Sequence, residues 1–456
     1  RETTIYKAPG AGWTDNRLTQ GMRVELSGGL EDGWWPVRMR NGEEGWAASW
    51  LSVPSNSGEP LPPAFSEEDI PSWEKPLYAR VIARHAYFRN IPYGGLSGKY
   101  DITRYGFIPR GAVLVLSDRI GHWMKARLSP LRSGWVYDEW LVPVEKPGAR
   151  NSRVSLSYGV PTAELIRIRA GRDRDSVRLR VKLSQAMPYS VESNLEPDAV
   201  KFSIFGVECN SLSWRWDWHC KKAGGTCNCP VGTHVLEGFI PVPGGAAGYE
   251  AGYTGGIFNL DVRIPYESSF KTIVVDPGHG APEPYFPGYA EGAYGPGECV
   301  EHEVVMNMSR TLADLLRKAG FEVFLTRDGT TVDMMDIYER VEFARMKGAD
   351  LFVSVHANGD VDPELSGIEV YWNEPQSRPL AAALARTMVA SAGTESGRDV
   401  YASFGVIRDP FIPAVLVESG YLTNPEEGEL LCTGNYQERI ARGMADGVIE
   451  YIGGFD

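Results

Sequence analysis

From residue 271 onward the sequence alternates short apolar runs with amphipathic segments. The apolar runs are TIVVD, FEVFLT, LFVSVH, IEVYW and AVLVES. Apolar residues between Val305 and Ala319 recur at three- and four-residue spacing, which predicts a helix with one buried face. A closing helix is expected from Tyr436 to Tyr451. This alternation predicts an α/β domain over residues 271–456, with a mostly parallel sheet flanked by helices.

Three of the predicted strands end in a residue suited to chemistry. These residues are His279, His356 and Glu418. Because the carboxyl ends of parallel strands meet at one edge of a sheet, we expect the three side chains to share a rim. Glu301 would join them from the start of the following helix, where the helix dipole favours a carboxylate. Two imidazoles and one carboxylate are a common ligand set for catalytic zinc, and they would leave Glu418 as acid and base. For each histidine taken alone, a hydrogen-bonded structural role is the alternative.

The residues before this domain show β patterns in three regions. Residues 1–54 and 77–146 are related by a degenerate repeat, and short strands between Gly turns predict a small β-barrel in each. Most of the tryptophans that recur at equivalent positions are expected in the barrel cores, and an exposed one or two could instead stack on sugar or peptide: Trp34, Trp46, Trp50, Trp123, Trp135 and Trp140. Residues 55–76 are rich in Pro and acidic residues and predict a linker. Residues 151–270 alternate at the period of half-buried strands and predict a third β domain.

Four of the six cysteines lie close together in the third region: Cys209, Cys220, Cys227 and Cys229. Their spacing matches none of the usual zinc motifs, so disulfides are favoured, and disulfides indicate an oxidising compartment. A metal site that includes His219 or His234 is the alternative. Cys299, two residues before Glu301, is expected to be buried or disulfide-linked rather than a zinc ligand.

Length and charge limit the classes of function. A chain of 456 residues is too long for one core, so several domains are expected. The formal net charge of −13 argues against nucleic acid as a partner. No apolar run approaches the roughly 20 residues of a membrane span. The chain begins at Arg1 without an initiator Met or an apolar signal core, which fits removal of an export signal.

Five motifs in the last domain occur in an order typical of one enzyme family. They are DPGHG, GAYGPGECVEHE, FLTRD, ERVEFARMKGADLFVSVHANG and IPAVLVESGYLTNPEEGELL. Over residues 271–453 the sequence resembles the zinc-dependent N-acetylmuramoyl-L-alanine amidases. The resemblance implies hydrolysis of the amide between N-acetylmuramic acid and L-alanine of the peptidoglycan stem peptide. It implies one Zn²⁺ held by His279, Glu301 and His356, with Glu418 catalytic. The family pattern places the middle ligand five positions before Met306, which selects Glu301 over Glu303.

Further residues are implied by the same resemblance. Asp276 and Asn358 are expected to orient the ligands. The arginines that match the family pattern either serve the site or pair with carboxylates: Arg327, Arg340 and Arg408. The connection over residues 281–291 is longer than usual in the family, and its Tyr285 and Tyr289 are expected either to line the substrate groove or to shield the metal. No long helix is inserted between His356 and Glu418, so the inhibitory helix of some members is expected to be missing.

The upstream regions resemble wall-binding modules. The first two are similar to bacterial Src-homology-3 modules, and the third resembles the AMIN type of wall-targeting domain. The resemblance implies peptidoglycan glycan strands and stem peptides as partners, an extracytoplasmic location, either periplasmic or secreted, and a monomer. The alternative is a catalytically silent wall-binding regulator with an amidase fold. The competent residues at all four site positions disfavour that alternative.

Overall fold

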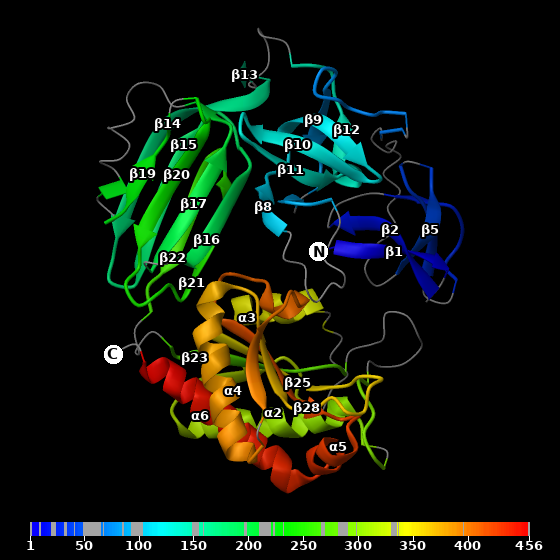
Figure 1. Cartoon of the computed structure of the whole chain (residues 1–456), viewed down its shortest axis with the longest axis vertical. Coiled ribbons are helices and arrows are strands. Elements are labelled where there is room, and N and C mark those ends of the chain that lie inside the picture. The colour runs from blue at the N-terminus through cyan, green and yellow to red at the C-terminus, as the bar shows by residue number, and fades with distance from the viewer. Residues whose placement is uncertain are drawn as a thin grey trace.

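The structure is a computed structural model in which a C-terminal α/β part is joined to β-rich parts (Figure 1). It describes residues 2–8, 11–19, 24–31, 34–40, 42–48, 65–66, 68–83, 86–92, 104–147, 155–157, 159–195, 198–208, 220–221, 224–230, 232–265, 270–280, 291–297, 299–329, 335, 337–394 and 396–454. The predictions for Tyr285, Tyr289, Cys209 and His219 lie outside these residues. In the part of the chain that is described, no helix has the length and apolar character needed to cross a bilayer.

The C-terminal part is built on a six-stranded sheet in the order β24-β23-β25-β28-β26-β27. Neighbouring strands are parallel except β26 and β28, which run antiparallel. The prediction of a mostly parallel sheet is therefore confirmed. The strand bounds are β23 Thr272–Pro277, β24 Glu322–Leu325, β25 Leu351–Asn358, β26 Ile368–Trp372, β27 Gly397–Tyr401 and β28 Ala414–Tyr421.

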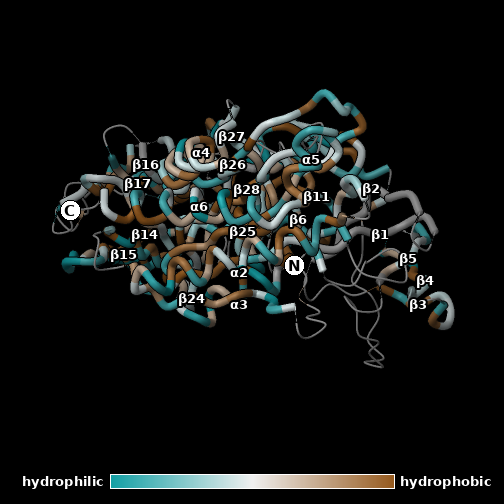
Figure 2. Tube along the Cα trace, turned by 90° about the horizontal axis from the view of Figure 1, so that it is seen from below, coloured by the Kyte–Doolittle hydropathy of each residue, from teal (hydrophilic) through white to brown (hydrophobic). Residues whose placement is uncertain are grey.

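Helices cover both faces of this sheet. One core cluster joins α2, α4 and α6 to residues such as Val353 and Val417, and a second joins α3 to Phe352 and Leu416 on the opposite face. The buried residues of α2 recur at helical spacing, and the tube at α2 alternates between hydrophobic and hydrophilic residues (Figure 2). The helix bounds are α2 Glu301–Lys318, α3 Ile337–Met346, α4 Arg378–Ala392, α5 Pro425–Leu431 and α6 Gly434–Gly453, with short 3₁₀ turns η4 Pro375–Ser377 and η5 Gly405–Ile407.

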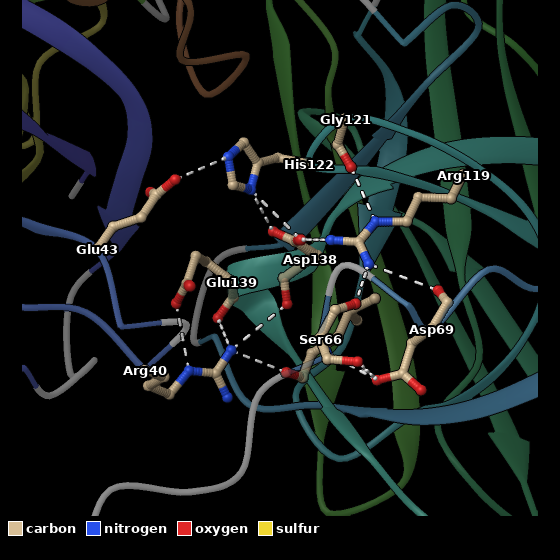
Figure 3. A network of polar contacts seen from close by, with 10 residues as sticks. Arg40, Glu43, Ser66, Asp69, Arg119, Gly121, His122, Asp138 and Glu139 are labelled. Atoms are coloured by element: carbon tan, nitrogen blue, oxygen red, sulfur yellow. Dashed lines mark hydrogen bonds and ion pairs between the residues drawn. The ribbon is translucent and has the colours of Figure 1, made fainter.

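The first region forms a five-stranded antiparallel sheet in the order β2-β1-β5-β4-β3. It meets the second region through a polar network (Figure 3). Arg40 lies 3.2 Å from the carboxylate of Glu139, and both side chains are almost fully buried. His122 contacts Asp138 at 3.3 Å and faces Glu43 of the first region. The strand bounds are β1 Glu2–Ala8, β2 Ala11–Thr19, β3 Glu25–Leu26, β4 Trp34–Arg38 and β5 Glu44–Ala48.

The second region is not a separate sheet. Its strands continue through β8 into β16 of the third region, giving an 11-stranded sheet in the order β12-β6-β9-β10-β11-β7-β8-β16-β17-β20-β19. Phe107 and Tyr189 pair at this junction and their rings stack at 5.5 Å. The bounds in the second region are β6 Leu77–Val81, β7 Ala86–Arg89, β8 Arg104–Ile108, β9 Val113–Ile120, β10 Trp123–Ser129, β11 Arg132–Tyr137, η2 Asp138–Trp140 and β12 Leu141–Pro143.

Part of the segment predicted as a linker packs against the second region. Phe65 belongs to the core cluster of that region, and Trp73 lies over the guanidinium of Arg127 at 3.7 Å. Arg127 also donates a 2.8 Å hydrogen bond to the carbonyl of Trp73. The described end of the segment is therefore attached to the second region and does not act as a free spacer.

The third region is a β-sandwich. Its second sheet, β13-β14-β15-β22-β21, packs against the β16-β17-β20-β19 end of the long sheet through one shared core. The period-2 burial along β15 is what a sheet covered on one face requires. The bounds are β13 Ser155–Ser157, β14 Val160–Arg172, β15 Ser176–Leu183, β16 Tyr189–Leu195, β17 Ala199–Phe205, β18 Val207–Glu208, β19 Thr226–Asn228, β20 Val235–Pro241, β21 Gly248–Thr254 and β22 Ile257–Arg263.

The sandwich docks on the edge of the α/β part where the parallel strands begin. Arg263 pairs with Asp350, the residue that precedes β25. Arg345, at the end of α3, reaches Glu250 of β21 at 2.6 Å. Phe411 lies between these two arginines, with their guanidinium carbons 5.3 and 4.6 Å from its ring centre. The opposite edge, where β23, β25 and β28 end, therefore lies away from this interface (Figure 1).

The cysteines in the described residues form disulfides, as the sequence favours. Cys220 is bonded to Cys227, and Cys229 is also disulfide-bonded, which excludes the alternative of a metal site at these positions. Cys299 is bonded to Cys432, 133 residues later, at the end of α5. This second bond ties the residues just before α2 to the C-terminal helices.

We expect loss of the Cys299–Cys432 bond to destabilise the α/β part by about 2–4 kcal/mol, because the cross-link closes a long loop in the unfolded chain. Calorimetry of the full chain should show a lower melting temperature for that part in Cys299→Ala/Cys432→Ala. The matched control, Cys220→Ala/Cys227→Ala, closes a loop of only 7 residues in the sandwich. An unchanged transition in the first variant would contradict this role.

Candidate metal centre and active site

Three side chains from different elements converge at the carboxyl ends of the parallel strands. Nε2 of His279 and Nδ1 of His356 each lie 3.0 Å from Oε1 of Glu301, and the two nitrogens are 3.2 Å apart. One donor atom from each residue falls within 4.8 Å of the other two. Two imidazoles and a carboxylate at this separation can hold a metal ion.

The bend after β23 aims His279 at this cluster. His279 has a φ of +58°, a left-handed conformation that few non-glycine residues adopt. Gly278, just before it, packs against the ring of His356, and a Cβ there would come within 2.3 Å of that ring. Gly280, with a φ of +71°, packs against the guanidinium of Arg327. The glycines of DPGHG are therefore required by close approach and by backbone conformation.

Two buried arginines hold the carbonyl groups of this bend. Arg327 donates to the carbonyls of Pro277 and Gly278 at 3.1 and 2.7 Å. Arg340 donates to the carbonyls of Pro277 and His279, both at 2.7 Å. Burial and the nearby Arg340 charge lower the pKa of Arg327 to about 10, which still leaves it charged at neutral pH. Four hydrogen bonds from two cations thus fix the backbone that carries His279.

Asp276 anchors one of these arginines. Its carboxylate lies 2.6 Å from Arg340 and accepts a 2.7 Å hydrogen bond from Ser354 and another from Thr326. Burial acts to raise the pKa of Asp276, but the Arg340 charge and these hydrogen bonds outweigh it, so the pKa lies below its usual value. Asp276 therefore affects His279 through Arg340 and does not touch the imidazole.

Glu301 is the first residue of α2 and is 4% exposed. The backbone N–H groups of Ala293 and Ala357 donate to its two oxygens at 2.8 and 3.0 Å. Burial acts to raise the pKa of Glu301, but hydrogen bonds to the two histidines hold it well below its usual range. Gly292 makes room for the carboxylate, because a Cβ there would come within 2.3 Å of it. Glu303 is exposed and is not part of the cluster.

Glu418 lies beside the cluster on the neighbouring strand. It pairs in register with His356 on β25 and with Glu369 on β26. Glu418 is 9% exposed, so its carboxylate is largely shielded but close to the rim. Because directly paired residues point to the same face of a sheet, the three side chains lie side by side.

Sequence reasoning missed Glu369 and its partner Arg398. Glu369 is 5% exposed and forms an ion pair with Arg398 of β27. A charged residue inside the apolar run IEVYW was the available signal, because such a residue must find a partner when the strand is buried.

Two other predicted residues make hydrogen bonds to groups outside the three-residue cluster. Asn358 donates to Glu369 at 3.2 Å, and among the described residues its side chain makes no hydrogen bond to the three clustered residues. Arg408 donates to the carbonyl of Ser403 and so supports its own loop. Tyr285 and Tyr289 lie outside the described residues, as does most of the 281–291 connection.

The C-terminal part of the chain is similar in sequence to known proteins. A family profile described as N-acetylmuramoyl-L-alanine amidase matches residues 273–450. N-acetylmuramoyl-L-alanine amidase AmiA of Escherichia coli is 30% identical over 233 residues, which cover 41% of this chain and 78% of that protein. Probable cell wall amidase LytH of Staphylococcus epidermidis is 28% identical, over 45% of this chain and 69% of that protein. Among solved structures, AmiC2 of Nostoc punctiforme is 33% identical, over 40% of this chain and 96% of that chain, with a TM-score of 0.36.

The family match covers the α/β part and includes the three clustered residues and Glu418. The chain belongs to the N-acetylmuramoyl-L-alanine amidase family.

We expect Asp276→Asn to cost about 3 kcal/mol or more of stability at neutral pH, because it leaves Arg340 buried without its counter-charge. The folded-state pKa of Asp276 is depressed, so the stabilisation is complete above its unfolded pKa near 4 and is lost as pH falls through the folded value. Denaturant unfolding should therefore show that the difference in free energy of unfolding between wild type and variant becomes smaller as the pH falls from 6 to 2.

The matched control for this prediction is Asp314→Asn. Asp314 pairs with Arg317 on the exposed side of α2, with 66% of its side chain accessible. An exposed pair of this kind contributes at most about 0.5 kcal/mol. If the two substitutions lowered the free energy of unfolding equally, the buried pair would not have the stabilising role assigned to it.

Proposed function

We propose that this protein hydrolyses the amide bond between N-acetylmuramic acid and L-alanine of the peptidoglycan stem peptide. The observation that carries the proposal is the convergence of His279, Glu301 and His356 beside Glu418, within a domain of the amidase family. A catalytically silent wall-binding regulator is not favoured, because all four positions retain competent side chains.

The cluster fits a zinc ion. Two neutral imidazoles and a carboxylate are preferred zinc ligands, and three protein ligands leave a position open for reaction. When bound there, zinc would supply Lewis acidity toward a carbonyl oxygen and a water molecule. Contacts within the protein position the residues that would hold it. The bend held by Arg340 positions His279, and Gly278 packs against the ring of His356. Two backbone N–H groups hold the carboxylate of Glu301.

Glu418 is placed to move protons. It stands next to His356 at the end of β28, close to the rim where a substrate carbonyl would arrive. We assign it the role of general base, which takes a proton from the attacking water. It would then return that proton to the nitrogen of the leaving L-alanine. Glu301 is a poor candidate for this role, because both of its oxygens accept backbone hydrogen bonds.

The arrangement of the whole chain suits a polymeric substrate. The sandwich docks at the edge opposite the site, so it does not cover the rim where we propose that a glycan strand binds. We propose that the β-rich regions, including two Src-homology-3-like modules and an AMIN-like domain, bind the wall and raise the local concentration of stem peptides. The disulfides support an extracytoplasmic location, either periplasmic or secreted.

Replacement of Glu418 tests this mechanism. Glu418→Gln keeps the size of the side chain but cannot accept a proton, so the rate should fall on the order of 10²–10⁴-fold. After dialysis against a zinc-containing solution, Glu418→Gln should still bind one zinc ion per chain. Glu301→Gln should instead lose zinc and activity together, because it weakens a ligand. Glu303→Gln, two residues along the same helix but exposed, is the matched control and should match wild type.

The assay should identify products as well as rate. Purified peptidoglycan is digested with native, chelated and zinc-resupplied protein, and the released fragments are analysed by mass spectrometry. The proposal predicts intact stem peptides with free L-alanine amino ends, lost on chelation and restored by zinc. Cleavage within the stem peptide, or full activity in Glu418→Gln, would overturn it.

A further inference from the structure

Four adjacent strands place four chemically active residues in one row. In register across β25, β28, β26 and β27 these are His356, Glu418, Glu369 and Arg398. Paired residues share a face, so the row runs from the metal cluster, past the proposed base, to a cation at the edge of the sheet. The last two members of this row are not used by the proposed mechanism.

Donors from four neighbouring side chains hold the carboxylate of Glu369. Arg398 donates to its Oε1 through Nε at 2.9 Å and also through Nη2. Its Oε2 accepts from Asn358 at 3.2 Å, from Tyr421 at 3.3 Å and from Tyr371. Burial and the neighbouring Glu369 raise the pKa of Tyr421 to about 12, so this hydroxyl remains a donor. Both oxygens of Glu369 are thus occupied.

Arg398 differs from its buried partner in that it faces solvent. Its side chain is 71% exposed, whereas that of Glu369 is 7% exposed. Glu369 holds one edge of the guanidinium, and among the described residues Nη1 has no hydrogen-bond partner. A planar guanidinium held on one edge presents its remaining N–H groups in a defined direction, which suits a carboxylate. The ion pair with Glu369 therefore orients a cation outward at the site.

We propose that Arg398 is a specificity-determining residue that binds a carboxylate of the stem peptide, with Glu369 as the residue that positions it. This inference rests on the proposed function. N-acetylmuramic acid offers no charge at this position once its lactyl group is in the scissile amide, whereas stem peptides carry free carboxylates. The row therefore also orients the substrate, with the peptide over β26 and β27 and the sugar toward β23 and α2.

The spacing of the row selects which carboxylate is bound. Arg398 is two strands from Glu418, a backbone separation of about 10 Å. An extended peptide advances about 3.3 Å per residue, and the arginine side chain reaches back over part of the gap. A carboxylate on the second residue of the stem peptide, next to L-alanine, fits this span. We infer a preference for a free carboxylate over a carboxamide at that residue.

The test compares two small substrates that differ only in this group. They are N-acetylmuramoyl-L-alanyl-D-glutamate with a free α-carboxylate and its D-isoglutamine counterpart. For the zinc-loaded full chain, kcat/KM on the carboxylate compound should exceed that on the carboxamide by about 10- to 100-fold, since a charge-assisted pair is involved. Arg398→Gln should abolish the preference by lowering kcat/KM on the carboxylate compound alone. Arg398→Lys should keep part of the preference.

Arg378→Gln is the matched control. Arg378 is 64% exposed and pairs with Asp399 on the same edge strand, but it lies in α4 and outside the row. Arg378→Gln should leave kcat/KM unchanged on both compounds. Equal losses on both compounds in Arg398→Gln would show a structural role and overturn the proposal, as would an unchanged preference.

Equilibrium binding separates this inference from the proposed function. Calorimetric titration of zinc-loaded Glu418→Gln with the two compounds measures the carboxylate preference without turnover. If wild type cleaves neither compound nor peptidoglycan, the proposed function fails, while the binding preference still decides the role of Arg398. Equal affinity for the two compounds overturns that role, and tighter binding of the carboxylate compound that is lost in Arg398→Gln supports it.

Discussion

The buried pair of Asp276 and Arg340 is the interaction on which the site depends most. It joins the end of β23 to α3, and the same guanidinium holds the carbonyl groups around His279. Without these donors, a left-handed histidine at the end of a buried strand would leave several carbonyl groups unpaired, which is costly inside a protein. Burial of one ion pair thus stabilises a strained bend, and the bend places His279 in the cluster that we propose binds a metal.

Contacts elsewhere in the chain also help to position this site. The sandwich packs on the opposite edge of the sheet through Arg263, Arg345 and Phe411. The Cys299–Cys432 bond fixes the segment that leads into Glu301. On the far side of Glu418, the Glu369–Arg398 pair closes the row. Each contact restricts the site from a different direction, which is what preorganised catalysis requires.

Much of the α/β part could be predicted from the sequence. Strand-helix alternation predicts the parallel sheet, and strand-end position alone predicts that His279, His356 and Glu418 share a rim. The choice of Glu301 over Glu303 needed the family pattern, because both glutamates lie at the start of the same helix. The pairing of Glu369 with Arg398 could not be predicted, because it depends on strand order, which local sequence does not encode. The Cys299–Cys432 bond and the pairing of Phe107 with Tyr189 are long-range contacts of the same kind.

The position of zinc in the protein can be measured directly. Anomalous diffraction from crystals of the zinc-loaded full chain, collected on both sides of the zinc absorption edge, would show it. We expect one strong peak within about 2–2.3 Å of donor atoms from His279, Glu301 and His356. A peak at other side chains, or none at this cluster in zinc-loaded crystals, would show that these three residues are not the zinc site.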